Sequence, residues 1–303
     1  MKVIVAGGSG FIGRKLIERL HQSQHEVILL SRKPEKVEKN FPSVVVRFWD
    51  AQTYNGLTNV IEGTDVIINL IGESIAVRRW TPAQKKRILG SRTESTRAIV
   101  DAIAQAKRKP SVLINASASG YYGNVPEGDV TETYQRGNGF LAEVCEKWEA
   151  EALKAREYGV RVVMLRSGVI LDKKGGALQK LLLPFWLFIG GPFGSGRQWF
   201  PWIHIQDAAN AILYAMENKK ISGAINLAAP ETVRMSEFCK ALGNILHRPS
   251  FLPVPAFILK IVLGEMAEPL LLHGQKLVPE KLTHAGFNFQ FANLEDALSD
   301  ILH

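Results

Sequence analysis

Three glycines near the start of the chain have the spacing of a phosphate-binding turn. Gly7, Gly10 and Gly13 follow the apolar segment 3–6 in the run Gly-Gly-Ser-Gly-Phe-Ile-Gly. Glycine permits a sharp turn at the first position, close backbone approach to a pyrophosphate at the second, and tight helix packing at the third. The helix that follows presents free N–H groups and the positive end of its dipole. The alternative is a purely structural turn, but the run predicts a dinucleotide site formed by Gly7, Ser9, Gly10, Phe11, Ile12 and Gly13.

The residues after the second predicted strand, 26–30, indicate which dinucleotide binds. NAD-binding units usually place Asp or Glu there, where the carboxylate accepts hydrogen bonds from the ribose hydroxyls. This chain has Ser31, Arg32 and Lys33 instead, and a guanidinium suits a 2′-phosphate. We therefore expect NADP(H) rather than NAD(H). The alternative is that Arg32 and Lys33 occupy an exposed turn without a ligand.

Two later strand ends complete the predicted cofactor site. Asp50 closes the third strand and is placed to bind the adenine amino group. The run Asn69-Leu70-Ile71-Gly72 closes the fourth strand, and its glycine would let the backbone pass the cofactor closely. We therefore add Leu70, Gly72 and Glu73 to the predicted contacts.

The elements that position these residues alternate in type. Val- and Ile-rich runs with little alternation, typical of parallel strands buried on both faces, occupy 26–30, 44–48, 65–71, 112–116 and 160–165. Helical segments lie between them, including one begun by Thr81-Pro82-Ala83-Gln84 and others at 95–106 and 140–158. The predicted fold is α/β, a Rossmann-type doubly wound parallel sheet with a smaller C-terminal substrate lobe. We assign 1–170, completed by 203–229, to the NADP-binding domain and 230–303, with 171–202, to the lobe.

Bulk properties restrict the remaining function classes. The 303 residues are 46% hydrophobic and 22% charged, as in ordinary globular proteins. Cys145 and Cys239 lie far apart, so we expect no disulfide framework and no metal site. The most apolar runs, 181–189 and 257–263, are too short to span a bilayer, which needs about 20 residues. With a strand predicted from residue 2 and no leader segment expected, we predict a cytoplasmic protein without a membrane partner.

The net charge of +8 does not predict a nucleic-acid partner, because the basic residues are dispersed. One concentration runs from Arg78 to Arg97. It is either a solvated helix surface or a funnel for a phosphate-bearing ligand. A small-molecule substrate is the expected partner, and the chain is expected to be a monomer or a homodimer.

Several motifs together resemble the extended short-chain dehydrogenase/reductase superfamily. They are the glycine run, Asp50, 69–72, 115–123, Gly194-Ser195-Gly196 and His204-Ile205-Gln206-Asp207. Arg79-Trp80-Thr81, Gly120-Tyr121-Tyr122-Gly123 and Gly196-Arg197-Gln198-Trp199 are similar to an atypical branch labelled "epimerase family protein", NAD-dependent epimerase/dehydratase-like with its own C-terminal domain. The resemblance covers nearly the whole chain and implies NADP(H) binding.

The chain departs from that superfamily at its catalytic groups. The superfamily uses a Tyr-x-x-x-Lys pair, which this sequence lacks. Alignment puts Leu141 or Phe140 at the tyrosine position and Cys145 or Val144 at the lysine position. Ala118 stands at the family's serine position. The remaining catalytic candidates are Tyr121, Ser117 and Ser119.

The predicted substrate contacts also depart from the sugar-nucleotide epimerases. Their diphosphate-binding arginine is replaced by Phe200, four residues before His204. With Trp199 and Trp202 it would line an apolar pocket, unless these aromatics are core of the lobe. Arg92 and Arg197 remain as candidate anion contacts.

Two functions fit these observations. The first is an NADP(H)-dependent oxidoreductase or epimerase-like enzyme acting on an unidentified small substrate. The second is a non-catalytic NADP(H)-binding sensor or regulator, a class that fits the cell-division label carried by some relatives.

Overall fold

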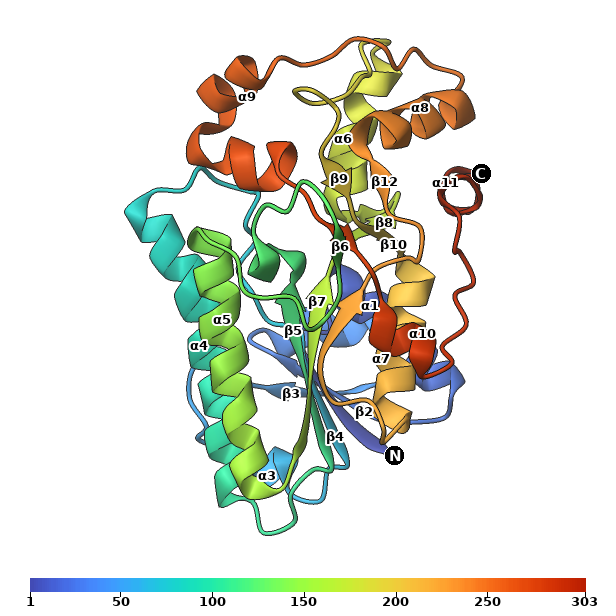
Figure 1. The fold of residues 1–303 in the computed structure, drawn as a ribbon. Helices are drawn as coiled ribbons and strands as arrows, with labels where there is room; N and C mark the ends of the chain where they lie inside the picture. Colours follow the sequence, from blue (N-terminus) through green and yellow to red (C-terminus); the bar gives the residue numbers. More distant parts are fainter.

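The computed structural model describes residues 1–303 and contains a seven-stranded parallel sheet covered by helices on both faces (Figure 1). The strands lie in the order β3 (Val45–Phe48), β2 (Glu26–Ser31), β1 (Lys2–Ala6), β4 (Val66–Asn69), β5 (Val112–Ala118), β7 (Arg161–Ser167) and β11 (Gly223–Leu227). Val3 pairs with Val27 on one side and Val66 on the other, so β1 lies where the strand order reverses. Ligands bind at such a switch point in open α/β sheets. The predicted fold class is confirmed.

The helices cover the sheet because each presents an apolar face to it. Helices α1 (Phe11–Gln22) and α7 (Ile205–Glu217) cover one face, where Leu16 and Leu20 join the core with Val5. Helices α3 (Leu57–Ile61), α4 (Pro82–Gln105) and α5 (Phe140–Leu153) cover the other, where Ile99 packs in the core with Ile4. Figure 1 shows α4 and α5 on the opposite side of the sheet from α1 and α7.

Two helix boundaries show how the local sequence specifies the structure. Thr81 accepts a hydrogen bond at Oγ1 from the Gln84 N–H at 3.2 Å, so α4 begins at the predicted cap. The segment 95–106 is the second half of that same helix and not a separate one. Helix α5 continues as a 3₁₀ turn (Lys154–Tyr158) and ends at Gly159. The φ of Gly159 is 76°, in the left-handed region that glycine adopts without strain.

A second group of elements lies beyond the carboxyl ends of the strands (Figure 1). It comprises β8 (Val169–Asp172), α6 (Gly176–Trp186), β9 (Trp199–Phe200), β10 (Trp202–His204), β12 (Val233–Arg234), α8 (Met235–Leu246), α9 (Ala256–Leu263) and α11 (Leu294–Leu302). Leu178, Trp202, Phe238 and Leu298 belong to its own buried core. The lobe therefore has a hydrophobic core of its own, distinct from the two cores that pack on the faces of the sheet.

The C-terminal chain returns to the sheet before it ends. Strand β13 (Lys276–Leu277) pairs with β6 (Asp129–Val130), and α10 (Glu280–His284) adds Leu282 to the core of the α1/α7 face. Residues 276–284 therefore contact the nucleotide-binding half, although the predicted division assigns them to the lobe. That division stays a prediction. Helix α2 (Pro34–Val37) completes the fold, and no helix is both long and apolar enough to cross a bilayer.

Candidate functional site

The glycine run lies at the switch point and packs directly against the end of β4. Gly7 has a φ of 80°, and a Cβ there would lie 2.9 Å from the carbonyl carbon of Leu70. A Cβ on Gly13 would lie 2.4 Å from the Gly8 Cα. Since backbone cannot yield as a flexible side chain can, these positions require glycine. The turn therefore brings β1, β4 and the start of α1 together.

Helix α1 begins without a side-chain cap. Gly10 is the N-cap residue and its N–H donates to the Gly7 carbonyl at 3.0 Å, while no acidic side chain lies in the first turn. The N–H groups of Phe11 and Ile12 therefore have no partner within the helix. Ser9 is half-buried beside them. Free N–H groups, the helix dipole and the bare glycine surface form an anion-binding site, so these residues fit the two phosphates of a dinucleotide.

The end of β2 carries two cations without carboxylate partners. Arg32 and Lys33 are exposed and form no ion pair within the chain. Ser31 Oγ accepts a hydrogen bond from the Lys33 N–H at 3.1 Å, which fixes the turn. A free guanidinium and ammonium beside a hydroxyl suit a phosphate monoester better than a ribose diol.

Asp50 organises the loop after β3. Its carboxylate accepts hydrogen bonds from the backbone N–H groups of Gln52 and Thr53, both at 2.9 Å, and from the Thr53 hydroxyl at 2.8 Å. Slight burial opposes ionisation, but these bonds outweigh it and hold the pKa of Asp50 below its usual value. The carboxylate stays ionised with room for one further donor. Its predicted contact with the adenine amino group stays a prediction.

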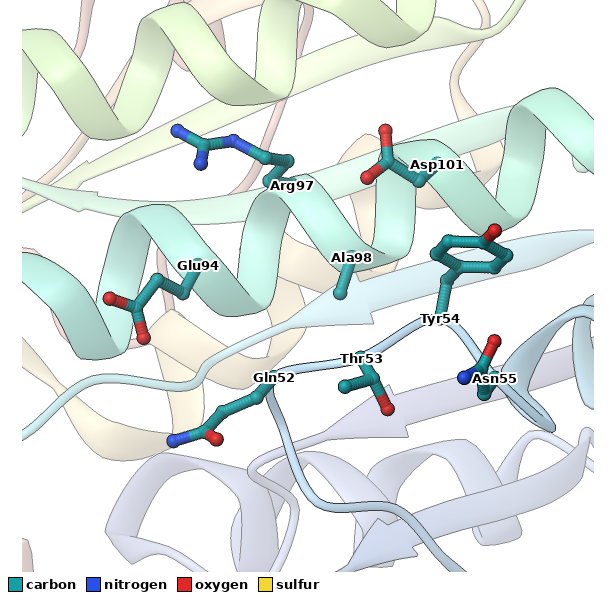
Figure 2. Close-up of a pocket in the computed structure, with 8 residues that line it drawn as sticks. All are labelled: Gln52, Thr53, Tyr54, Asn55, Glu94, Arg97, Ala98 and Asp101. Atoms are coloured by element: carbon teal, nitrogen blue, oxygen red, sulfur yellow. The ribbon is translucent and has the colours of Figure 1, made fainter.

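A polar cavity of about 310 Å³ opens directly beyond this loop, against α4 (Figure 2). Its lining is Gln52, Thr53, Tyr54, Asn55, Glu94, Arg97, Ala98 and Asp101. Arg97 is bound by Glu151 at 2.7 Å, so its charge is already compensated. No residue of the glycine run lines this cavity, so it is distinct from the phosphate cradle.

Arg92 supports the loop that follows β4. Its Nη1 donates to the carbonyl oxygens of Glu73 (3.0 Å) and Ile88 (2.9 Å), and its guanidinium lies 5.0 Å from the Trp148 ring. A Cβ on Gly72 would lie 2.9 Å from the Arg92 Cζ, so a side chain at this position would have to displace the guanidinium. Burial lowers the pKa of Arg92. The structure gives Arg92 a role in holding the loop, while its predicted contact with substrate is untested.

In the short-chain dehydrogenase/reductase superfamily, the helix that corresponds to α5 carries the catalytic tyrosine and lysine. In this chain other residues occupy those positions. Leu141 lies against Gly120, where a Cβ would come within 3.0 Å of the Leu141 Cβ. Cys145 is buried, with its Sγ 3.8 Å from the Ala118 carbonyl oxygen. Burial raises the pKa of Cys145 to about 11, so it is a neutral thiol and not a nucleophile. Neither the tyrosine nor the lysine has a chemical substitute at these positions.

One turn further along α5, Glu149 forms a buried ion pair with Arg166 of β7. Two hydrogen bonds of 2.9 and 2.8 Å join the carboxylate and the guanidinium, and both side chains are under 8% exposed. Burial disfavours the charge, but the carboxylate outweighs it and raises the pKa of Arg166. Glu149 also accepts a hydrogen bond of 2.6 Å from Ser117 Oγ. Ser117 is thus buried and bonded to a structural carboxylate, an environment that does not favour its predicted catalytic role.

Tyr121 lies over this ion pair. The Arg166 guanidinium carbon is 3.5 Å from the centroid of the Tyr121 ring, while Arg166 Nη1 donates to the Tyr122 hydroxyl at 3.1 Å. Burial raises the pKa of Tyr122 to about 12, and its hydroxyl donates to Asn226 at 2.7 Å. Tyr122 is therefore a structural neutral phenol. The Tyr121 hydroxyl has no hydrogen-bond partner in the chain and remains available.

A second cavity, of about 200 Å³, lies beside this cluster and between the two halves of the molecule. Its lining is Trp80, Gly120, Gly123, Asn138, Gly139, Phe140, Leu141, Glu265, Glu268, Pro269, His273 and Gln275. Gln275 Nε2 donates to the carbonyl oxygens of Ser119 (3.1 Å) and Gly123 (2.6 Å), which ties the C-terminal region to the turn after β5. Ser119 accepts this bond through its backbone carbonyl, but it does not itself line the cavity.

The predicted aromatic substrate pocket does not form as expected. Phe200 and Trp202 are buried in the core of the lobe, where Phe200 packs on Phe238 with ring centroids 4.3 Å apart. Substrate cannot reach these two rings. Trp199 is half-buried beneath the Arg234 guanidinium at 3.5 Å. Arg197 is exposed and its carbonyl oxygen accepts a bond from Arg234. Phe200 and Trp202 differ from the expectation because their rings form part of the apolar core of the lobe.

Sequence reasoning missed the Glu149–Arg166 pair and the role of Gln275. A weak signal existed for the first, because Arg166 directly follows an apolar run of strand residues and must be buried with it. The partner on a helix 17 positions earlier could not be identified without the fold. Gln275 gave no signal, since it joins elements about 150 residues apart.

Comparison with known proteins agrees with this arrangement. The NAD dependent epimerase/dehydratase family model matches residues 3–175 and 184–228, most of the chain. The chain belongs to the NAD dependent epimerase/dehydratase family. A further family model, a domain of unknown function (DUF1731), matches residues 254–301.

Several epimerase family proteins are similar to this chain over most of their length. The chain is 43% identical to the epimerase family protein SDR39U1 homolog, chloroplastic, of Arabidopsis thaliana, covering 100% of this chain and 87% of the relative. It is 41% identical to the epimerase family protein YfhF of Bacillus subtilis, covering 100% and 98%. The crystal structure of human epimerase family protein SDR39U1 (isoform2) with NADPH superposes with a TM-score of 0.88 at 35% identity, covering 99% of each chain. UDP-glucose 4-epimerase of Thermotoga maritima shares the fold, with a TM-score of 0.81 at 18% identity.

Proposed function

We propose that this epimerase-family chain binds NADP(H) and transfers hydride to or from a small substrate, as an oxidoreductase or an epimerase-like enzyme. The observation that carries the proposal is the glycine cradle at the switch point, with an uncapped helix and the two free cations Arg32 and Lys33 at its ribose end. The human relative crystallised with NADPH supports the choice of cofactor.

The proposed substrate site is the cavity lined by Gly120 and Gly123, the two residues that flank Tyr121 and Tyr122 in the chain. At about 200 Å³ it accepts only a small molecule. Trp80 and Phe140 supply aromatic walls, with ring centroids 5.0 Å apart. Its carboxylates are already paired, Glu265 with Lys85 and Glu268 with Lys260 at 2.7 Å. A neutral carbonyl compound or alcohol therefore fits the site better than a sugar nucleotide.

In this proposal the bound nicotinamide supplies hydride chemistry, and the chain supplies orientation and a proton. The Tyr121 hydroxyl is free to donate a proton to the substrate oxygen, since it has no partner within the chain. Arg166 holds the Tyr121 ring from one face at 3.5 Å and is itself held by Glu149. Arg166 therefore fixes the orientation of the Tyr121 ring. In this proposal Tyr121 takes over the role of the missing Tyr-x-x-x-Lys pair.

A second function has an observation in its favour. Leu141 and Cys145 occupy the catalytic positions of α5, and neither exchanges protons near neutral pH. Such a site suits a non-catalytic NADP(H)-binding sensor, in which cofactor binding changes the shape of the cleft between sheet and lobe.

NADPH oxidation with a panel of small aldehydes and ketones separates these functions. We expect turnover by the wild type, and a loss of about 100-fold or more in kcat for Tyr121→Phe, because a general acid contributes at least that much. NADPH affinity should be unchanged. Tyr134→Phe is the matched control, since Tyr134 is a half-buried tyrosine near Tyr122.

The outcomes distinguish the two roles. Tight NADPH binding without turnover of any compound contradicts the enzyme and leaves the sensor. Equal turnover by Tyr121→Phe and Tyr134→Phe retains the enzyme but removes Tyr121 as the proton donor.

A further inference from the structure

Helix α9 is apolar on nearly every side, yet the protein covers little of it. Its sequence is Ala-Phe-Ile-Leu-Lys-Ile-Val-Leu, and Leu259 is its single buried residue. Phe257 is 63% exposed and Ile261 is 71% exposed. A helix that is hydrophobic all round is normally buried. Something outside the chain is therefore expected to cover α9.

Exposed apolar side chains also occur at the end of α6 and in the segment that precedes α9. Exposed apolar side chains occur in 183–189, including Trp186 at 53%, and at Phe251 and Leu252. The Leu252 N–H donates to the Gly190 carbonyl at 3.1 Å, so these segments are adjacent. Figure 1 shows α6 and α9 at the same end of the molecule, opposite the N-terminus. We call this surface, formed by α9, 183–189 and 251–252, the apolar face.

Cations without carboxylate partners surround the apolar face. Arg79 Nη2 donates to the carbonyl oxygens of Ile261 and Val262 at the end of α9, at 3.1 and 2.6 Å. Lys180 of α6 bonds only the Ala76 carbonyl, at 2.9 Å, and exposed Arg78 lies between these contacts in sequence.

The opposite edge carries a further cation. The Arg248 guanidinium lies 4.5 Å from the Phe188 ring, and its hydrogen bond is to a backbone carbonyl. The nearby carboxylates Glu265 and Glu268 are each paired with a lysine. The rim of the apolar face is therefore positive.

We propose that the apolar face docks on an anionic phospholipid surface. Phe257 and Ile261 would enter the headgroup and acyl boundary, while Arg78 and Arg248 contact lipid phosphates. Trp186 belongs to the residue type that gathers at that boundary. The sequence argument against a membrane partner rests on the length needed to span a bilayer, and a helix lying in the interface needs no such length.

A second copy of the chain is a weaker occupant for the same surface. A twofold contact places the same patch of both copies together, so the cations at the rim would face each other. Like charges brought together without carboxylates oppose association. An anionic lipid surface complements the rim instead.

Vesicle flotation tests the proposal with the full chain. Vesicles of phosphatidylcholine and phosphatidylglycerol should carry the protein, and pure phosphatidylcholine vesicles should carry much less. The double variant Phe257→Asp/Ile261→Asp should reduce vesicle binding about tenfold or more, because two apolar side chains no longer enter the lipid. Arg78→Glu should reduce it about fivefold. Phe48→Asp, at a 68% exposed phenylalanine on the edge strand β3, is the matched control and should change nothing.

Three results would overturn the proposal. One is no binding to either vesicle, whatever the oligomeric state measured by light scattering. Another is equal binding to both vesicles, which removes the anionic lipid. The third is an equal loss of vesicle binding in Phe48→Asp and in Phe257→Asp/Ile261→Asp. Circular dichroism of each variant checks that a loss does not come from unfolding, and Arg78→Glu provides a readout that leaves the apolar residues intact.

Discussion

Replacing Arg166 by methionine is expected to lower the free energy of unfolding by about 3–5 kcal/mol. The substitution leaves the Glu149 carboxylate buried with only Ser117 as a donor, and a buried charge without its partner is costly. It also removes the donor to the Tyr122 hydroxyl and the cation over Tyr121. Urea denaturation followed by circular dichroism measures the change.

Arg97→Met is the matched control for this prediction. Arg97 also pairs with a glutamate of α5, Glu151 at 2.7 Å, but the Arg97 side chain is 55% exposed and Glu151 keeps a second partner, Lys154, at 2.7 Å. Ion pairs that solvent reaches contribute about 0–1 kcal/mol, so little should be lost. Equal losses in the two variants would contradict the account of the buried pair. The double variant Arg166→Met/Glu149→Leu should recover part of the stability, because no unpaired charge remains.

Gly10→Val is expected to weaken NADPH binding by about 100-fold or more, a loss of about 2.7 kcal/mol or greater. The branched side chain would stand where the backbone must approach the phosphates and would cover the first N–H groups of α1. A Cβ at Gly10 lies 3.1 Å from the Gly7 carbonyl oxygen, a tight contact that small movements can relieve. The fold should therefore survive, and calorimetry measures the affinity.

A graded series makes this prediction specific. Gly10→Ala should bind NADPH with an affinity between those of the wild type and Gly10→Val, because it adds one methyl group. Gly90→Ala is the control, since Gly90 lies inside α4 and its Cβ would meet only the flexible Glu94 carboxylate. NADPH binding by Gly10→Val at the wild-type affinity would mean that the phosphates lie elsewhere.

The fold was predictable because its signals are local. The strand runs, the glycine turn and the cap at Thr81 depend on residues close in sequence, and these features form where expected. Helix α4 was expected as two segments because the middle of the helix is polar, so the helical spacing of apolar residues is interrupted there. Polar residues on the exposed side of a helix carry no boundary information.

The site was predictable only where backbone geometry decides it. The glycine cradle follows from residue type and spacing. In contrast, the hydrogen bond that engages the Ser117 hydroxyl depends on Glu149, 32 positions away. Phe200 and Trp202 look like pocket residues in sequence, but the lobe needs large apolar side chains for its own core. Burial is a tertiary property, so the sequence could not separate a pocket wall from a core residue.

Calorimetric titration of nucleotide-free protein with NADPH and with NADH, for the wild type and Arg32→Ala, tests the central claim most directly. The account predicts that the wild type prefers NADPH by about 30- to 1000-fold, since a charged contact to the 2′-phosphate contributes about 2–4 kcal/mol. Arg32→Ala should lose most of that preference, and Arg108→Ala, at an exposed arginine far from the site, should keep it. Equal binding of both nucleotides, or binding of neither, would contradict the account.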